Sequence, residues 1–251
     1  EELMDLELAG RIAFVSGSHR GTGEGIAKVL AREGAHVLVH GFRPDEPERV
    51  VAEIRAAGGQ ASGVSGDISS DEGAARAVEA ALHAVPHVDV LVNNYGVAEG
   101  RGWLDGSTGD WLSIYQKNVL SAVRLTQAFV PGMRSRGFGR VIFLGTIGSS
   151  RPAARMPHYY ASKATLPNMT VSLAKELAGS GVTVNLVSPG LIATREVLER
   201  LSEERLRENP SGAACTPEDV GNLVAWLASP LSRSVNGSNL RIDGGSADSV
   251  N

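Results

Sequence analysis

The sequence predicts an α/β fold in which one doubly wound parallel sheet of about seven strands forms a single domain over residues 1–251. Apolar runs of about five residues recur along the chain, and longer amphipathic stretches separate them, as is typical of strands that crossover helices bury on both faces. The 251 residues are 42% hydrophobic and include 30 glycines, so the chain is long enough for one large core and short for two domains. No internal repeat or low-complexity linker divides it.

The apolar runs place the strands, and the amphipathic stretches between them are expected to be helices. We expect strands at residues 11–16, 36–40, 60–65, 88–92, 140–145, 182–187 and 239–242. Residues 48–57 show helical periodicity, and Gly58 and Gly59 supply a C-terminal stop signal before the next strand.

One segment differs from this alternation of strands and helices. Residues 195–210 follow a break at Pro189 and Gly190, and they mix Glu and Arg with four apolar residues, which are Val197, Leu198, Leu201 and Leu206. This pattern predicts a short amphipathic substrate lid near residues 191–212, and it fits an ordinary solvated surface helix equally well.

The charge and the cysteine content exclude several classes of protein. The formal net charge is -4 and the basic residues are scattered, so we expect no nucleic-acid partner. Cys215 is the single cysteine of the sequence, which excludes an internal disulfide and a thiolate metal cluster; we expect no metal and a reducing, cytoplasmic location. No apolar run reaches the roughly 18 residues of a membrane span, and the acidic start lacks the features of a signal peptide. We therefore expect no membrane partner.

A glycine-rich loop follows the first predicted strand and precedes a helix that is expected to begin near Glu24. Glycines let the backbone approach a pyrophosphate, and the free N–H groups and positive dipole of a helix N-terminus attract it. The spacing G-x-x-x-G-x-G departs from the G-x-G-x-x-G pattern of dinucleotide-binding loops, so a purely structural role stays open. The residues expected to contact a dinucleotide are Gly17, Ser18, Arg20, Gly21, Thr22 and Gly23.

The end of the second strand predicts which dinucleotide binds. An NAD site carries a carboxylate there for the ribose hydroxyls, but Gly41 occupies that place, and we expect no carboxylate to reach the ribose. Arg43 and Arg20 offer two guanidinium groups to the 2'-phosphate of NADP. We therefore expect NADP as the preferred cofactor, with NAD as the alternative. Asp45 and Glu46 stand against this preference, and Arg43 could instead be a solvated turn residue.

Tyr159 and Lys163 are four residues apart in a segment with helical character. That spacing places both side chains on one face of a helix, so that the ammonium lies near the phenol. A tyrosine has a pKa of about 10, and a neighbouring positive charge lowers this pKa toward neutral pH. Tyr159 is therefore a candidate acid/base, although Tyr and Lys pairs with this spacing are also common by chance. Tyr160 is a poorer candidate because it lies three residues from Lys163.

Further motifs follow in order along the chain. They are Asn93-Asn94-Tyr95-Gly96 after the fourth strand, Asn118, Pro189-Gly190 with Thr194, and Asp243-Gly244-Gly245 after the last strand. With the glycine loop and the pair of Tyr159 and Lys163, these motifs mean that the whole chain resembles the short-chain dehydrogenase/reductase family. The resemblance implies a Rossmann-like fold and hydride transfer between a nicotinamide cofactor and an alcohol or carbonyl carbon.

The same resemblance assigns roles to individual residues. It implies that Tyr159 donates the proton to the carbonyl, that Lys163 lowers its pKa and binds the nicotinamide ribose, and that Asn118 anchors a water of the proton relay. Thr146 stands thirteen residues before the tyrosine, where the family has a serine that polarises the substrate. Threonine keeps the hydroxyl, and its methyl group stiffens χ1 and predicts a narrower substrate range. The further cofactor contacts implied are Asp67, Ile68, Asn94, Gly96, Pro189, Gly190, Ile192 and Thr194.

Two positions keep alternative interpretations. Asp67 could cap the helix that follows it, as aspartate often does. Tyr95 stands where the family usually has alanine, and its side chain either packs against the end of the sheet or projects into the cofactor cleft.

The residues together with the resemblance imply an NADPH-dependent ketone reductase that acts on a small molecule. The resemblance alone implies the 3-oxoacyl type of substrate and a homotetramer. One alternative is an NAD-dependent dehydrogenase of an alcohol, a steroid or a polyol. The other is a non-catalytic NAD(P)-binding sensor, which the set of Asn118, Thr146, Tyr159 and Lys163 disfavours because a pure binder needs no acid/base. Sugar-nucleotide epimerases share the architecture, but they are longer than this chain and have a different glycine spacing.

Overall fold

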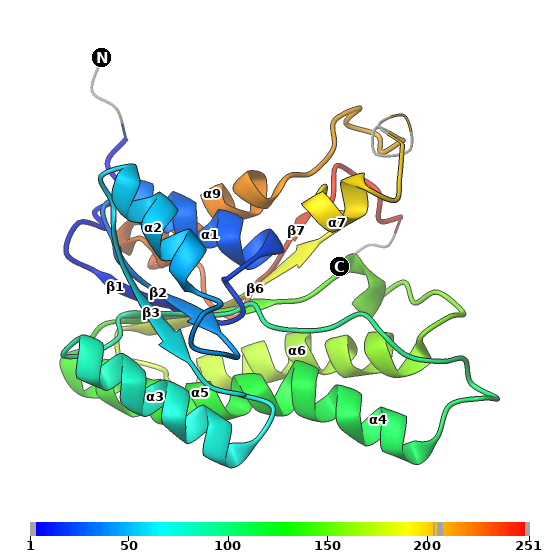
Figure 1. Ribbon diagram of the computed structural model, residues 1–251, viewed down its shortest axis with the longest axis horizontal. Helices are drawn as coiled ribbons and strands as arrows, with labels where there is room; N and C mark the ends of the chain where they lie inside the picture. Colours follow the sequence, from blue (N-terminus) through cyan, green and yellow to red (C-terminus); the bar gives the residue numbers. More distant parts are fainter. Residues whose placement is uncertain (1–3, 203, 205–207, 249–251) are drawn as a thin grey trace.

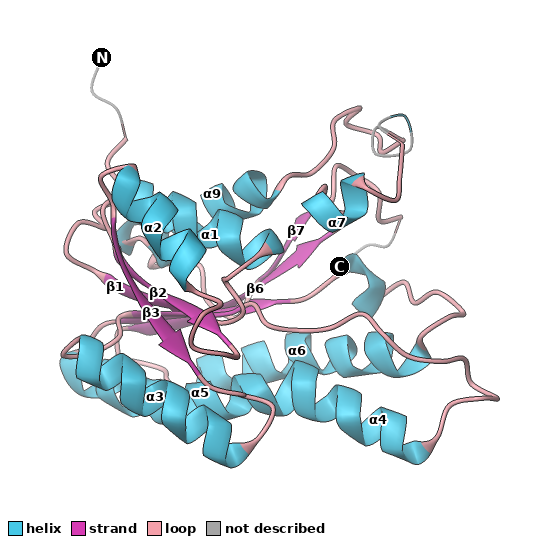
Figure 2. Ribbon diagram, viewed as in Figure 1, coloured by secondary structure: helices cyan, strands magenta, loops and turns pink. Residues whose placement is uncertain are grey.

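Seven strands form one parallel sheet in a computed structural model that describes residues 4–202, 204 and 208–248. The order across the sheet is β3-β2-β1-β4-β5-β6-β7, and every neighbouring pair is parallel (Figure 2). The strands are β1 (Ile12–Val15), β2 (His36–Gly41), β3 (Gln60–Ser65), β4 (Val90–Asn93), β5 (Gly139–Leu144), β6 (Val182–Pro189) and β7 (Asn239–Ile242). The predicted doubly wound parallel sheet is therefore confirmed.

Helices cover both faces of this sheet, with α1, α2 and α9 on one face and α3, α5 and α6 on the other (Figure 1). The main helices are α1 (Gly21–Arg32), α2 (Glu48–Ala56), α3 (Asp71–Ala84), α4 (Thr108–Tyr115), α5 (Ser121–Arg136), α6 (Pro157–Glu176), α7 (Arg195–Leu198) and α9 (Pro217–Ala228). Strand residues that point to opposite faces belong to two separate apolar clusters, as Val15 and Phe14 do. Each cluster joins the sheet to one helix layer, because successive strand side chains alternate between the faces.

The observed elements differ from the predicted ones mainly at their ends. The seven strands lie where the apolar runs predicted them, with boundaries shifted by two residues at most. Helix α1 begins at Gly21 rather than near Glu24, because Arg20 is extended and leaves the helical path to start directly after it. Of the predicted lid, residues 203 and 205–207 lie outside the described residues, and the described part includes the short helix α7.

The functional part of the sheet is set by the position of β1. β1 pairs with β2 through Val15 and Val39 and with β4 through Val15 and Val92, so the chain turns in opposite directions on its two sides. The loops after β1 and β4 therefore diverge and leave a crevice at the carboxyl edge, where open α/β sheets bind ligands. The glycine loop and the Asn94 to Gly96 segment are these two loops.

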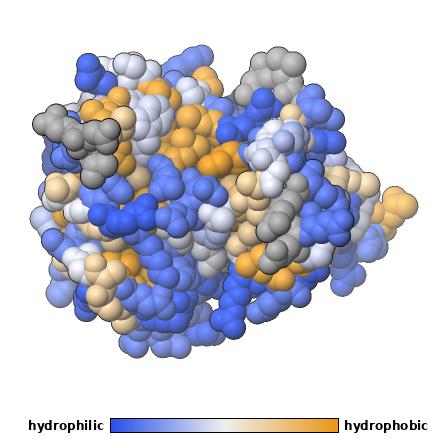
Figure 3. Space-filling view, turned by 90° about the horizontal axis from the view of Figure 1, so that it is seen from above, coloured by the Kyte–Doolittle hydropathy of each residue, from blue (hydrophilic) through white to orange (hydrophobic). Residues whose placement is uncertain are grey.

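Polar residues cover most of the face seen from above, and apolar residues gather near its centre (Figure 3). In the part of the chain that the structure describes, no helix combines the length and the apolar character that a bilayer crossing requires.

Candidate active site

A cavity of about 890 Å³ opens at the carboxyl edge of the sheet. Its walls come from the glycine loop, the turn after β2, the segment after β4 and the region of α7. The lining residues are Gly17, His19, Arg20, Gly21, Thr22, Gly23, Phe42, Arg43, Glu46, Asn94, Tyr95, Gly96, Val97, Glu196 and Arg200. Eight of the predicted cofactor residues are thus brought to one cavity.

The glycine loop fits a dinucleotide by its geometry. A Cβ atom on Gly23 would lie 2.5 Å from Asn94 Nδ2 and 2.6 Å from the Gly17 carbonyl oxygen, so only glycine allows the loop to close on itself here. Gly17 has a φ of 62°, a left-handed conformation that favours glycine. The side chain of the N-cap residue Arg20 makes no capping hydrogen bond, so the first turn of α1 presents its backbone N–H groups to the cavity.

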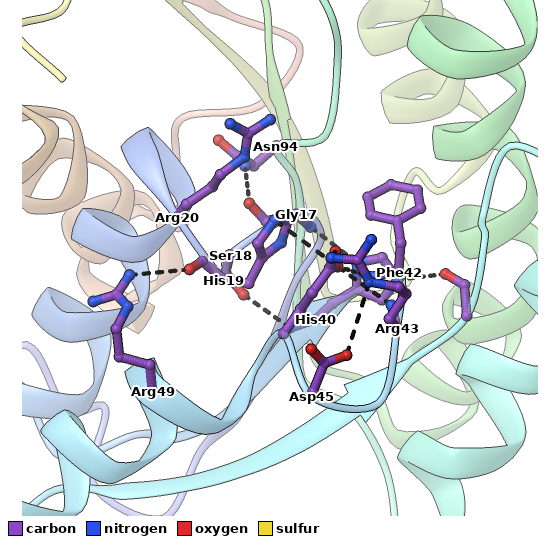
Figure 4. A network of polar contacts seen from close by, with 12 residues as sticks. Gly17, Ser18, His19, Arg20, His40, Phe42, Arg43, Asp45, Arg49 and Asn94 are labelled. Atoms are coloured by element: carbon purple, nitrogen blue, oxygen red, sulfur yellow. Dashed lines mark hydrogen bonds and ion pairs between the residues drawn. The ribbon is translucent and has the colours of Figure 1, made fainter. Parts of the chain in front are cut away.

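A buried histidine holds this loop in place, and no sequence pattern indicated its role. His40 Nδ1 accepts a hydrogen bond from the Gly17 N–H at 3.0 Å, and His40 Nε2 lies 2.9 Å from the Gly66 carbonyl oxygen (Figure 4). This pairing requires the proton on Nε2. Burial lowers the pKa of His40 to about 4, so the ring stays neutral at physiological pH. His40 therefore joins the glycine loop to the turn after β3.

Ser18 belongs to the same support and faces away from the cavity. Its hydroxyl donates to the Val15 carbonyl at 2.7 Å and accepts from the His40 N–H at 2.9 Å. The side chain is fully buried. Ser18 was predicted as a cofactor contact, and its side chain is hydrogen-bonded to β1 and β2.

An aromatic pair forms one wall of the large cavity. The rings of Phe42 and Tyr95 lie 4.7 Å apart between centroids, and both residues line the cavity. Burial raises the pKa of Tyr95 to about 12, so its hydroxyl stays protonated. The side chain of Tyr95 thus combines the two arrangements considered for it, because its ring packs against Phe42 after β2 and also lines the cavity.

Both predicted phosphate-binding arginines lie beside carboxylates. Arg20 Nη1 is 3.4 Å from Glu196 Oε1, which connects the glycine loop to α7. Arg43 Nη2 is 3.1 Å from Glu46 Oε1. Figure 4 shows the second contact of Arg43, whose Nε is 3.8 Å from Asp45 Oδ1. The expectation that no carboxylate reaches the end of the second strand is wrong, because the chain turns back after β2 and brings Glu46 there.

A second cavity of about 140 Å³ shares Thr22, Asn94 and Gly96 with the large one. It brings together residues from five segments of the chain, which are Thr22, Asn94, Gly96, Ala98, Leu144, Gly145, Tyr159, Lys163, Pro189 and Ile192. The predicted pair of Tyr159 and Lys163 thus meets the predicted residues from β4 and β6 at one end of the larger cavity.

The protonation equilibria of this pair differ from the expected ones. Burial raises the pKa of Tyr159, a hydrogen bond with Thr146 lowers it, and the sum lies above the ordinary value. The prediction that the pKa of Tyr159 is lowered is therefore wrong, because burial raises this pKa by more than the hydrogen bond with Thr146 lowers it. Burial also lowers the pKa of Lys163 to about 8, and its Nζ donates to the Leu144 carbonyl at 2.8 Å. Lys163 Nζ would lie 2.7 Å from a Cβ atom on Gly96, so only glycine leaves room for it.

Thr146 and Asn118 do not line either cavity. Thr146 Oγ1 accepts a hydrogen bond from the Gly148 N–H at 3.1 Å, at the start of the 3₁₀ turn η2 (Ile147–Ser149). Asn118 lies in the π-helical turn η1 (Gln116–Leu120), a feature often found at functional sites. Its side chain holds both the N–H and the carbonyl of Val97, at 2.7 Å and 3.1 Å, and donates to Ser162 Oγ. Asn118 thus positions the segment that carries Gly96.

The remaining predicted residues lie outside both cavity linings. Ile68 is fully buried in the core. The Asp67 carboxylate accepts from the N–H and hydroxyl of Ser69, and Ser70 is the N-cap of α3, so the capping role considered for Asp67 is wrong. Gly190 packs against Asp243, and Thr194 precedes α7.

Comparison with known proteins extends over almost the whole chain. The family model described as enoyl-(acyl carrier protein) reductase matches residues 17–247. The 3-oxoacyl-[acyl-carrier-protein] reductase FabG of Chlamydia pneumoniae is 33% identical over 245 residues, which cover 96% of this chain and 99% of the relative.

Two solved structures show the same fold at comparable identity. The L-sorbose reductase of Gluconobacter frateurii, complexed with NADPH and L-sorbose, is 28% identical with a TM-score of 0.91, and the match covers 98% of this chain and 100% of that one. A 7α-hydroxysteroid dehydrogenase complexed with NADH and 7-oxo glycochenodeoxycholic acid is 30% identical with a TM-score of 0.90 over 98% of each chain. The sheet, the two cavities and these likenesses agree, and the chain belongs to the short-chain dehydrogenase/reductase family of NAD(P)-dependent oxidoreductases.

Proposed function

We propose that the protein reduces a ketone of the 3-oxoacyl type with NADPH. The observation that carries the proposal is the position of Tyr159, which lines the small cavity beside the large one and shares a hydrogen bond with Thr146. A proton donor at the end of a cavity with the features of a dinucleotide site supports carbonyl reduction. The likeness to a 3-oxoacyl reductase supports the substrate class.

In the proposed mechanism the chain's own residues handle the proton and the developing negative charge. A bound nicotinamide supplies the hydride for the substrate carbon. The Tyr159 hydroxyl donates its proton to the substrate oxygen, and the Thr146 hydroxyl donates a hydrogen bond to the same atom. Lys163 Nζ, with a pKa of about 8, releases and regains a proton close to neutral pH and can resupply Tyr159. Asn118 keeps Gly96 and Val97 in position beside Lys163.

The proposed preference for NADPH is supported by two guanidinium groups in one cavity wall. The side chains of Arg20 and Arg43 are 66% and 72% exposed, so both have room to turn toward a phosphate. The pyrophosphate is proposed to bind at Gly17, Gly23 and the N-terminus of α1, where the backbone comes close and its N–H groups are uncapped.

Replacing Arg43 with alanine should weaken NADPH binding by about tenfold and NADH binding by less than about twofold, because one charge-assisted hydrogen bond to the phosphate is lost. Titration of nicotinamide fluorescence on the free protein measures both dissociation constants. Arg76→Ala is the matched control, since Arg76 is exposed on α3 outside the cavity lining and its removal changes the net charge equally. Equal weakening of both cofactors in Arg43→Ala would place the phosphate elsewhere.

A panel of ketones tests the proposed function directly. The purified protein is assayed with NADPH and with NADH against a 3-oxoacyl thioester, a steroid ketone and a sugar ketone, and nicotinamide absorbance is followed. We expect the highest kcat/KM for the 3-oxoacyl thioester with NADPH. A higher value for another ketone class would replace the substrate proposal, and cofactor binding without any turnover would favour the sensor.

We further propose that residues 191–212 act as a substrate lid. Supporting this, Glu196 and Arg200 line the large cavity, and Glu196 is in contact with Arg20 across it. Opening of this segment would separate the two charges and widen the cavity entrance.

We also propose a homotetramer in the cytoplasm. An apolar groove of about 570 Å³ between α5 and α6, lined in part by Val130, Met169 and Leu173, supports packing of these helices against a second copy. Light scattering at micromolar concentration distinguishes four chains of 26.3 kDa from one. The single, buried Cys215 supports a reducing compartment.

A further inference from the structure

The carboxylate of Glu46 accepts hydrogen bonds from a group of donors at the end of β2. Its Oε2 accepts from the backbone N–H groups of Phe42 at 2.6 Å and of Arg43 at 3.2 Å. Its Oε1 lies 3.1 Å from Arg43 Nη2, and His19 Nε2 approaches Oε2 to 4.0 Å. The side chain is only 16% exposed and lines the large cavity. Glu46 therefore fills an anion site that the chain itself builds.

The local backbone is shaped to let Glu46 return to this place. It lies five residues beyond the last residue of β2, in the turn before α2. A Cβ atom on Gly41 would lie 2.7 Å from Glu46 Cβ, so a side chain at the strand end would exclude it. Burial would raise the pKa of Glu46, but the N–H groups of Phe42 and Arg43 lower it, and the net pKa lies below its ordinary value. The carboxylate is thus ionised at neutral pH.

These donors are the ones that the 2'-phosphate of NADP needs. Arg20, Arg43 and His19 line the same cavity as Glu46, and the two backbone N–H groups complete a site for one anion. A phosphate and an ionised carboxylate repel one another and compete for the same hydrogens. The uncharged 2'-hydroxyl of NAD has no such conflict, because it can donate to the carboxylate.

We propose that Glu46 is a specificity-determining residue that holds the 2'-phosphate site as an internal occupant, so that NADP(H) binds only when Glu46 is displaced while NAD(H) binds beside it. The inference rests on the proposed function, since it concerns the same cofactor cavity. It accounts for the coexistence of two arginines suited to NADP and a carboxylate suited to NAD in one wall. Glu46 thereby limits an NADP preference that Arg20 and Arg43 would otherwise make much stronger.

The test compares two substitutions that remove the same charge from adjacent residues. In Glu46→Gln the amide oxygen can still accept from the Phe42 N–H, so the turn is retained. Asp45→Asn is the matched control, because Asp45 is 77% exposed and lies 3.8 Å from Arg43 Nε. Dissociation constants of NADPH and NADH are measured by nicotinamide fluorescence on the free protein, without substrate, and thermal unfolding checks that each variant is folded.

Glu46→Gln should tighten NADPH by about tenfold and change NADH by less than about threefold, since displacing a charged hydrogen-bond partner costs at least that factor. Asp45→Asn should change either constant by less than about threefold, as is usual for an exposed pair. Glu46→Ala is a second variant, and it should shift the NADPH constant in the same direction. Weaker NADPH binding in both Glu46 variants, or an equal shift in Asp45→Asn, would overturn the inference.

The two proposals fail in different ways. If the unmodified protein binds both cofactors but Glu46→Gln leaves their ratio unchanged, only the role of Glu46 is wrong. If the unmodified protein binds neither cofactor, the proposed function and the inference both fall.

Discussion

Replacing Tyr159 with phenylalanine should lower kcat by about 10²-fold to 10⁴-fold and leave NADPH binding nearly unchanged, because only the transferable proton is removed. The ring of Tyr159 packs edge-on against that of Tyr160 at 5.1 Å between centroids, and phenylalanine keeps this contact. The Tyr159 hydroxyl forms a hydrogen bond with Thr146, and Tyr159 lines the small cavity. Steady-state rates and a fluorescence titration of NADPH measure the two effects separately.

The matched control for this prediction is Tyr160→Phe, which removes the same group from the adjacent residue. Tyr160 lies outside the lining of both cavities, so its variant should keep kcat within about threefold. A Tyr159→Phe protein with more than about a tenth of the parent rate would show that another group donates the proton. Loss of NADPH binding in that variant would instead indicate a structural role for the hydroxyl.

Replacing Thr146 with valine should lower kcat by about 10²-fold to 10³-fold, the usual cost of losing one donor to a developing negative charge. Valine keeps the branched shape but also removes the acceptor of the Gly148 N–H, so the variant should lose about 1 kcal/mol of unfolding free energy. Thr146→Ser retains the oxygen, and it should keep both the rate and the stability while accepting bulkier ketones. Rates on the ketone panel and thermal melts measure these outcomes.

Ser149→Ala separates this interpretation from its nearest rival. The Ser149 hydroxyl donates to the Thr146 carbonyl at 2.7 Å, and we expect its loss to leave turnover almost unchanged. If Thr146→Val is fully active and Ser149→Ala is not, then Ser149 polarises the carbonyl and Thr146 only caps the turn.

Much of the fold could be predicted because it depends on local patterns. The apolar runs that became β2, β3 and β7 are strands in the structure almost residue for residue, since short runs between turn signals have few other stable arrangements. The spacing of Tyr159 and Lys163 was readable for the same reason, because the pitch of a helix places residues four apart on one face. The motifs that follow β1, β4, β6 and β7 lie at strand ends, so the sheet order carries them to one edge.

Properties that depend on burial could not be predicted from local sequence patterns. The pKa of Tyr159 is raised rather than lowered, because burial by several distant segments outweighs its hydrogen bond with Thr146. His40 resembles any polar residue near a strand end, yet it joins Gly17 to Gly66 across two neighbouring loops. Its contacts depend on the register of β2 with β1 and β3, which no local pattern contains.

The sequence by itself determined the parallel sheet, the glycine loop after the first strand and the shared helix face of Tyr159 and Lys163, because these depend on short-range periodicity and spacing. Only the tertiary structure decided which charged groups meet. Glu46 reaches the donors at the end of β2 because Gly41 lacks a side chain, and His19 approaches the same carboxylate from a different loop. A carboxylate that the sequence places a few residues beyond the strand end therefore lies in the large cavity beside Arg43, since through-space distances and not positions along the chain set electrostatic interactions.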